Sequence, residues 1–147
     1  MPRADNGLRA LIHSKLCKPD WLWTSVETGL TAGGVPDSFW AHRPSQRSGW
    51  IEHKATTGWH VEIRPHQCAW IDTYTRAGVR VHIAVRASGT GSSQGHGDSL
   101  WLVRGESVRE LMDRGLAKLA DKSVVGKWFG PPPKWKWAEI AGFLTRG

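Results

Sequence analysis

Apolar residues recur at helical spacing near the start of the chain and again in its last third. Residues 4–16 place four aliphatic side chains on one helical face before Pro19 ends the pattern. These side chains are Leu8, Leu11, Ile12 and Leu16. The same spacing predicts a helix over residues 106–120 and a short closing helix over residues 137–143.

Between these helical segments the apolar residues alternate with polar ones, which is typical of strands. Residues 38–40 and 50–54 have a strand pattern and enclose a polar segment with Pro44 and Gly49, so we predict a β-hairpin. Further strands are predicted at residues 79–85 and 100–103, with a loop rich in Gly and Ser over residues 87–99. Residues 20–28 are predicted to form a strand or an extended segment that leads to the hairpin.

The hairpin brings three charged residues together. Its midpoint falls near Ser45, so paired residues should have numbers that sum to about 90, which places Asp37 opposite residues 52–54. Side chains alternate along a strand, so Glu52 and Lys54 point to one face and His53 to the other. The sequence therefore predicts that two carboxylates and one ammonium converge.

Two carboxylates beside a lysine are suited to phosphodiester hydrolysis. Carboxylate oxygens bind Mg²⁺, and a lysine can position the attacking water or keep the carboxylates ionised. The alternative is an ordinary ion pair between Glu52 and Lys54 on a half-exposed strand. Because Trp50 and Ile51 flank the pair and a Pro-Asp dipeptide precedes it by 15 residues, we favour the catalytic interpretation.

A second helix is predicted directly after the hairpin, over residues 64–77. Pro65 suits its first position and Gly78 the residue just past its end. Gln67 shares the face that carries Trp70 and Ile71, so we expect its amide to be buried and to find a partner at the charged cluster. A surface glutamine at the start of the helix is the alternative.

Composition limits the class of protein. The 147 residues fit one domain and carry a net charge of +7, which favours a polyanionic partner such as DNA. The two cysteines have no spacing typical of zinc sites or disulfides, and no apolar run predicts a signal peptide or a membrane span. We therefore expect a cytoplasmic protein.

The residues Pro36, Asp37, Glu52, His53 and Lys54 resemble the motif of the PD-(D/E)XK nuclease superfamily. The segment 64–85 is similar to the helix with an early Gln, the Ala-Gly and the strand found in the VRR-NUC-like and small phage-type branches, which include Holliday junction resolvases. The resemblance spans residues 26–85. It implies an α/β fold with a restriction-endonuclease-like core, in which a small mixed sheet with the catalytic hairpin at its centre has the helix over 64–77 on one face and the first helix on the other.

The resemblance also implies a role for each site residue. Asp37 and Glu52 would bind Mg²⁺, for which Mn²⁺ would substitute, and His53 would add its backbone carbonyl. Lys54 would position the attacking water with help from Gln67. Glu27 lies upstream, where it would either complete the metal site or be a solvated loop carboxylate.

The implied function is a metal-dependent DNA endonuclease of phage or bacterial DNA processing, acting in the cytoplasm of the cell or host. Branched DNA cleavage and nicking are both compatible with the motif. The alternative is a nucleic-acid-binding protein that keeps the fold without cleaving. We expect one nuclease domain over residues 1–147, with its core at about 20–104 and a C-terminal helix and strap over 105–147.

The strap begins KWFGPPPKWKW at Lys127 and alternates lysines with tryptophans. It could grip phosphates and unpaired bases, or it could pack its tryptophans on the core, and we favour packing because most of the 10 tryptophans must be buried. The candidate DNA contacts are Lys134, Lys136, Arg43 and Arg47. Exposed tryptophan on the strap or the first helix would favour a homodimer.

Overall fold

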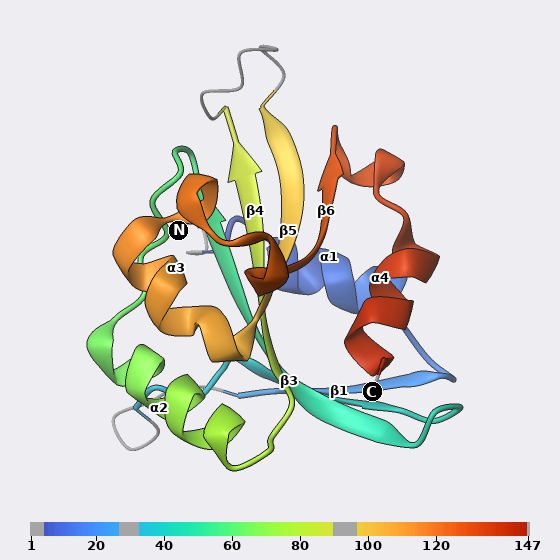
Figure 1. The fold of residues 1–147 in the computed structure, drawn as a ribbon. Coiled ribbons are helices and arrows are strands. Elements are labelled where there is room, and N and C mark those ends of the chain that lie inside the picture. Colours follow the sequence, from blue (N-terminus) through green and yellow to red (C-terminus); the bar gives the residue numbers. More distant parts are fainter. Residues whose placement is uncertain (1–4, 27–32, 90–96, 147) are drawn as a thin grey trace.

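A computed structural model describes residues 5–26, 33–89 and 97–146 of the chain and has one six-stranded mixed sheet (Figure 1). The strands follow one another across the sheet in the order of the sequence, from β1 to β6. They are β1 (Trp21–Ser25), β2 (Ser38–His42), β3 (Arg47–Thr56), β4 (Val81–Ser88), β5 (Asp98–Arg104) and β6 (Val124–Phe129). All neighbouring strands are antiparallel except β3 and β4, which are parallel.

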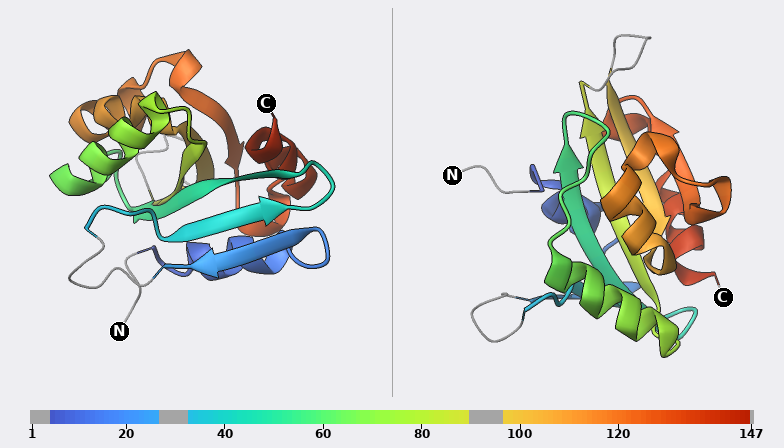
Figure 2. Two further views of the ribbon diagram at one scale, coloured as in Figure 1. Left: turned by 90° about the horizontal axis from the view of Figure 1, so that it is seen from below. Right: turned by 60° about the vertical axis from the view of Figure 1, so that its left-hand side comes forward.

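Helices cover both faces of this sheet. They are α1 (Leu8–Lys15), α2 (Pro65–Arg76), α3 (Val108–Arg114) and α4 (Trp137–Thr145). Figure 2 shows α2 and α3 together on one face, with α1 on the other. The prediction that the first helix and the helix after the hairpin lie on opposite faces is confirmed.

The predicted hairpin is present with the predicted register. Ser38 pairs with Ile51 and His42 with Arg47, so paired numbers sum to 89. The strands extend further into the polar segment than expected, and the turn is confined to residues 43–46. The helix α2 then links β3 to β4, as a parallel strand pair requires.

Two hydrophobic clusters fill the space on either side of the sheet. Ile51 lies in the cluster that includes α1 and α4, whereas Ile83 lies in the cluster that includes α2 and α3. Glu52 pairs with Ile83 across β3 and β4 and therefore faces α2, as does Lys54 two residues on. The predicted division of faces along β3 is confirmed.

The structure corrects several element boundaries. The helix predicted over 106–120 ends at Arg114, because Gly115 has φ 77 and leaves the helical conformation. The loop predicted over 87–99 loses residues 87–88 to β4 and 98–99 to β5. The first helix begins at Leu8 rather than at residue 4, and residues 124–129, which we did not predict as a strand, form the edge strand β6.

The C-terminal strap packs on the core, as favoured. Trp128 and Trp135 are buried in the cluster that includes α1 and α4, while Lys134 and Lys136 are exposed. The exposed strap tryptophan on which the homodimer prediction depends is not found at these two positions, and α1 contains no tryptophan. The homodimer stays a prediction. Within the described ranges, no helix has the length and apolar character needed to cross a bilayer.

Candidate active site

The carboxylate of Glu52 lies at the centre of the predicted cluster. Glu52 is 6% exposed, and its Oε2 lies 3.4 Å from the Nζ of the partly buried Lys54, so the two side chains form a largely buried ion pair. Its Oε1 accepts a hydrogen bond from the backbone N–H of Asp37 at 3.2 Å. This hydrogen bond links the Glu52 side chain of β3 to Asp37, the residue directly before β2.

Gln67 joins the helix α2 to this ion pair. Its Oε1 accepts hydrogen bonds from the Lys54 Nζ and from the backbone N–H of Arg64, both at 3.0 Å. Its Nε2 donates to the Glu52 Oε2 at 3.4 Å. Gln67 is half-buried, and both its amide oxygen and its amide nitrogen have partners in the cluster, as predicted from its position on the inner face of the helix.

Asp37 lies across from Glu52 and is held by His53. The Asp37 Oδ2 accepts a hydrogen bond from the backbone N–H of His53 at 3.1 Å, and the Oδ1 lies 2.5 Å from the His53 Nδ1. Each carboxylate oxygen has further lone pairs, so these bonds leave acceptor capacity on Asp37. We did not predict that the His53 side chain would contact Asp37.

The backbone of His53 faces the same side as Asp37. The pairing of β3 with β2 ends at Ile51. Two residues later, the N–H of His53 points toward the same neighbouring chain segment and donates to the Asp37 carboxylate. The N–H and C=O of one strand residue point to the same neighbour. The His53 carbonyl is therefore directed to the Asp37 side, as its expected role requires.

The pKa of Glu52 is perturbed by its surroundings. Burial raises the pKa of the Glu52 carboxyl to about 7, the Asp37 carboxylate acts in the same direction, and the Lys54 ammonium lowers it in part. The lysine thus offsets some of the cost of ionisation without removing it. A divalent cation beside the two carboxylates would supply the missing positive charge.

His13 of α1 approaches the site from the opposite face of the sheet. Its Nε2 lies 3.1 Å from the Ser38 Oγ, its ring stacks on Trp23, and the His53 ring is 5.8 Å away. Burial, followed by the nearby His53, lowers the pKa of His13 to about 4, so the ring is neutral at physiological pH. No spacing in the sequence pairs His13 with the hairpin, because their contact depends on how α1 packs.

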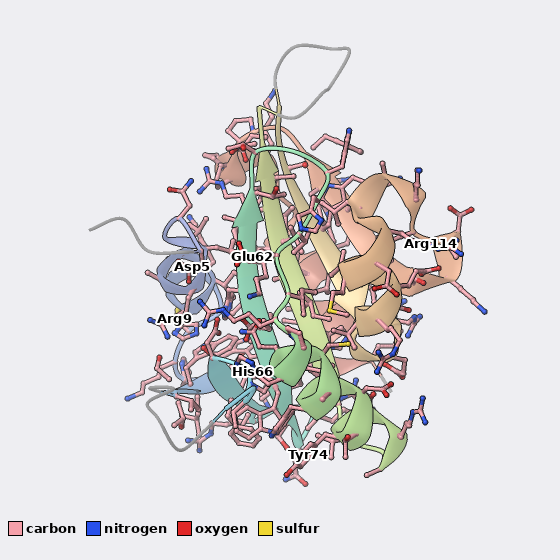
Figure 3. The ribbon with its side chains drawn as sticks, turned by 90° about the vertical axis from the view of Figure 1, so that its left-hand side faces the viewer. Asp5, Arg9, Glu62, His66, Tyr74 and Arg114 are labelled. Carbon is pink, nitrogen blue, oxygen red and sulfur yellow. The ribbon has the colours of Figure 1, made fainter. Side chains whose placement is uncertain are left out.

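The strand β3, which carries Glu52 and Lys54, runs between α1 and α2 (Figure 3). Asp5 and Arg9 lie on the α1 side, Glu62 lies in the segment before α2, and His66 lies in the first turn of α2. Basic and acidic side chains therefore border the strand that carries Glu52 and Lys54.

The predicted DNA contacts lie elsewhere. Arg47 opens β3 five residues before Glu52, which is about 16 Å along the strand, and Arg43 is in the adjoining turn. Lys134 and Lys136 lie next to β6, three strands from β3. A hollow of about 450 Å³ also lies away from the cluster, and its lining includes Arg80, His82 and Phe143 of α4.

The metal prediction concerns two carboxylates and one carbonyl. Within residues 5–26, 33–89 and 97–146, no group of three or more His, Cys, Asp or Glu side chains could hold a metal ion. Asp37 and Glu52 are only two such side chains, and the third ligand that the prediction names, the His53 carbonyl, belongs to the backbone. Glu27, which would either complete the metal site or be a solvated carboxylate, lies outside the described residues.

Comparison with known proteins leaves the site to be judged on its own geometry. No protein family, curated protein or solved structure matches this chain.

Proposed function

We propose that this protein is a Mg²⁺-dependent DNA endonuclease with a restriction-endonuclease-like core. The supporting observation is the buried Glu52, which contacts Lys54, Gln67 and the backbone of Asp37 at 3.2 to 3.4 Å. A buried carboxylate, a lysine and an amide seldom meet in this way for stability alone, because burying an ion pair costs desolvation energy. Perturbed titratable groups are typical of catalytic sites.

The residues that would hold the metal are Asp37, Glu52 and the carbonyl of His53. When bound, Mg²⁺ would offset the negative charge that develops on a phosphate during hydrolysis. Glu52 would bind in its ionised form, which burial opposes and Lys54 favours. The short contact with His53 holds the Asp37 carboxylate in place.

Lys54 would orient the attacking water. Its ammonium has three N–H groups, of which two have acceptors in Gln67 Oε1 and Glu52 Oε2. A third N–H can donate to a water beside the carboxylates. Gln67 fixes the direction of the ammonium, because its own amide is held by the first turn of α2.

DNA is the proposed substrate because the chain carries a net charge of +7. Cleavage of plasmid and branched DNA with Mg²⁺ tests the proposal. We expect Lys54→Ala to lower the cleavage rate at least 100-fold, a typical loss for one catalytic group, while the circular dichroism spectrum stays unchanged. Lys15→Ala removes an equal charge from an exposed position in α1 and should cleave at the wild-type rate.

Two outcomes would contradict this assignment. Wild-type turnover by Lys54→Ala would remove Lys54 from the mechanism. Tight DNA binding by a wild-type protein that cuts neither substrate would favour the alternative, a nucleic-acid-binding protein that does not cleave.

A further inference from the structure

Two of the exposed large hydrophobic side chains gather around one tryptophan. In the described part of the chain these exposed side chains are Leu22, Trp59, Tyr74 and Phe129. Trp59 and Phe129 are 37% and 55% exposed, and both contact Trp101. Large aromatic side chains that share an exposed patch are a common feature of binding surfaces.

The contacts define a compact cluster of three rings and one ammonium. The Trp59 and Phe129 ring centroids lie 6.0 and 6.3 Å from that of Trp101, each with its plane at 80° to the Trp101 plane. The Lys127 Nζ lies 5.1 Å from the Trp101 ring centroid. We call these four residues the Trp101 cluster.

The backbone beneath Trp59 is firmly held although its ring is exposed. The Trp59 carbonyl accepts a hydrogen bond from the Leu116 N–H at 2.8 Å. Gly115 permits this approach, because a Cβ there would lie 2.7 Å from the same carbonyl oxygen. A ring presented by an ordered backbone loses little entropy when it binds a partner.

The Trp101 cluster lies on the same face of the sheet as the catalytic lysine. Lys54 pairs with Val85, Val85 with Trp101, and Trp101 with Lys127, so these residues form one row across β3 to β6. Trp101 is two strands from Lys54, which is about 10 Å. Val61, two residues after Trp59, is buried in the same hydrophobic cluster as Val85 and Trp101.

We propose that the Trp101 cluster binds the unpaired bases of single-stranded DNA, with Trp59 and Phe129 stacking on bases and Lys127 contacting a phosphate. Exposed rings beside a lysine are the combination that binds single strands without sequence preference. The net charge of +7 favours a polyanion over an apolar peptide as the partner. The further expectation that the bound DNA strand reaches Glu52 rests on the proposed nuclease function.

Binding of a labelled oligothymidylate, measured by fluorescence anisotropy in EDTA, tests the cluster without cleavage. An abasic oligonucleotide of equal length has the same phosphates but no bases. We expect the wild type to bind the oligothymidylate more tightly. Phe129→Ala and Trp59→Ala should each weaken that binding by about five-fold or more, and should leave binding of the abasic strand unchanged.

Control variants separate stacking from folding. Trp59→Phe keeps an aromatic ring and should retain most of the affinity. Tyr74→Ala removes an exposed ring of α2 that stacks on Trp70 outside the cluster, and should bind like the wild type. Phe129 is the most exposed of these rings, so its replacement tests the cluster even if Trp59→Ala does not fold.

Two results would overturn the inference: equal affinity of the wild type for both strands, or unchanged oligothymidylate binding by Phe129→Ala and Trp59→Ala. Failure of the nuclease proposal is a different result. In that case the oligothymidylate binds as expected, but no DNA is cut when Mg²⁺ is added. Conversely, the protein could cleave DNA while Phe129→Ala and Trp59→Ala bind the oligothymidylate as tightly as the wild type. That result would support the nuclease proposal and reject the Trp101 cluster as a base-binding surface.

Discussion

Glu52 is the residue whose charge state controls the proposed site. Burial raises its pKa to about 7, and the Asp37 carboxylate adds to the effect. In the unfolded chain the same carboxyl has its ordinary pKa of 4.5. Between these two values the folded protein binds more protons at this position than the unfolded one, so the contribution of Glu52 to stability is lost as pH rises from about 4.5 to about 7.

Replacing Glu52 by glutamine should remove this pH dependence. We expect the free energy of unfolding of wild type relative to Glu52→Gln, in the absence of metal, to fall by up to about 3 kcal/mol between pH 4.5 and pH 8. Urea unfolding of both proteins over this range measures the difference.

The comparison of wild type with Glu52→Gln is needed because buried histidines change the free energy of unfolding with pH in the opposite direction. Burial lowers the pKa of His13 and of His82 to about 4, so their contribution is lost as pH falls below their ordinary pKa of 6.5. Both proteins contain these histidines, so their effect cancels in the difference between the two free energies of unfolding. A difference that stays constant with pH would contradict the raised pKa of Glu52.

His53 illustrates what a motif does not reveal about a residue. The resemblance gives this position only a backbone role. Its side chain is buried, and its Nδ1 lies 2.5 Å from the Asp37 Oδ1. That contact depends on the backbone before β2 turning toward β3, which the alternation of residues along one strand does not describe.

The role of His53 can be separated from its bulk. We expect His53→Leu to lower Mg²⁺ affinity by about 10-fold or more, the usual effect of losing a group that orients a metal ligand. His53→Asn can place an amide N–H near the position of Nδ1 and should recover part of the affinity. Calorimetric titration with Mg²⁺ measures both, and equal affinities for the wild type and His53→Leu would reject the orienting role.

At the scale of elements, local signals predicted the hairpin and α2 well. Polar residues around Pro44 fix the turn, and Pro65 and Gly78 bracket the helix, so the register and the helix limits follow from nearby residues. The strand β6 was missed because its exposed and buried positions do not alternate and Gly126 and Lys127 interrupt its apolar residues. It is a strand because β5 pairs with it, and that pairing is not visible within its own sequence.

A close approach between two elements sets the position of Asp37 relative to α2. Gly34 has φ 87, and a Cβ there would lie 2.3 Å from the backbone oxygen of His66. Gly34→Ala should therefore destabilise the protein by about 2 kcal/mol or more and should also slow DNA cleavage, because the first turn of α2 carries Gln67.

Thermal unfolding and cleavage rates measured side by side test this effect. Gly142→Ala is the matched control, because it lies within α4 with open space around its Cβ, and it should be neutral or stabilising by up to about 1 kcal/mol. Equal stability of the two variants would show that the loop before β2 adapts to the added methyl group.

At the scale of the whole molecule, the two hydrophobic clusters pack on opposite faces of one sheet, so we expect them to unfold together. Leu144 is 1% exposed in α4, whereas Leu22 in β1 is 41% exposed. We expect Leu144→Ala to cost about 2 to 5 kcal/mol and Leu22→Ala less than about 1 kcal/mol. Urea unfolding should give one transition in each case, and two separate transitions would contradict the single domain predicted from chain length.

The hydrophobic cluster beneath Asp37 and His53 draws residues from both α1 and α4. Leu8 and Ile12 pack in it together with Ile140 and Leu144, which belong to α4 and are far from α1 along the chain. Contacts between such distant parts of a chain form late. A nascent chain that still lacks α4 therefore has an incomplete core beneath these residues, and we expect a newly made molecule to acquire the geometry of the proposed site only after α4 has been synthesised.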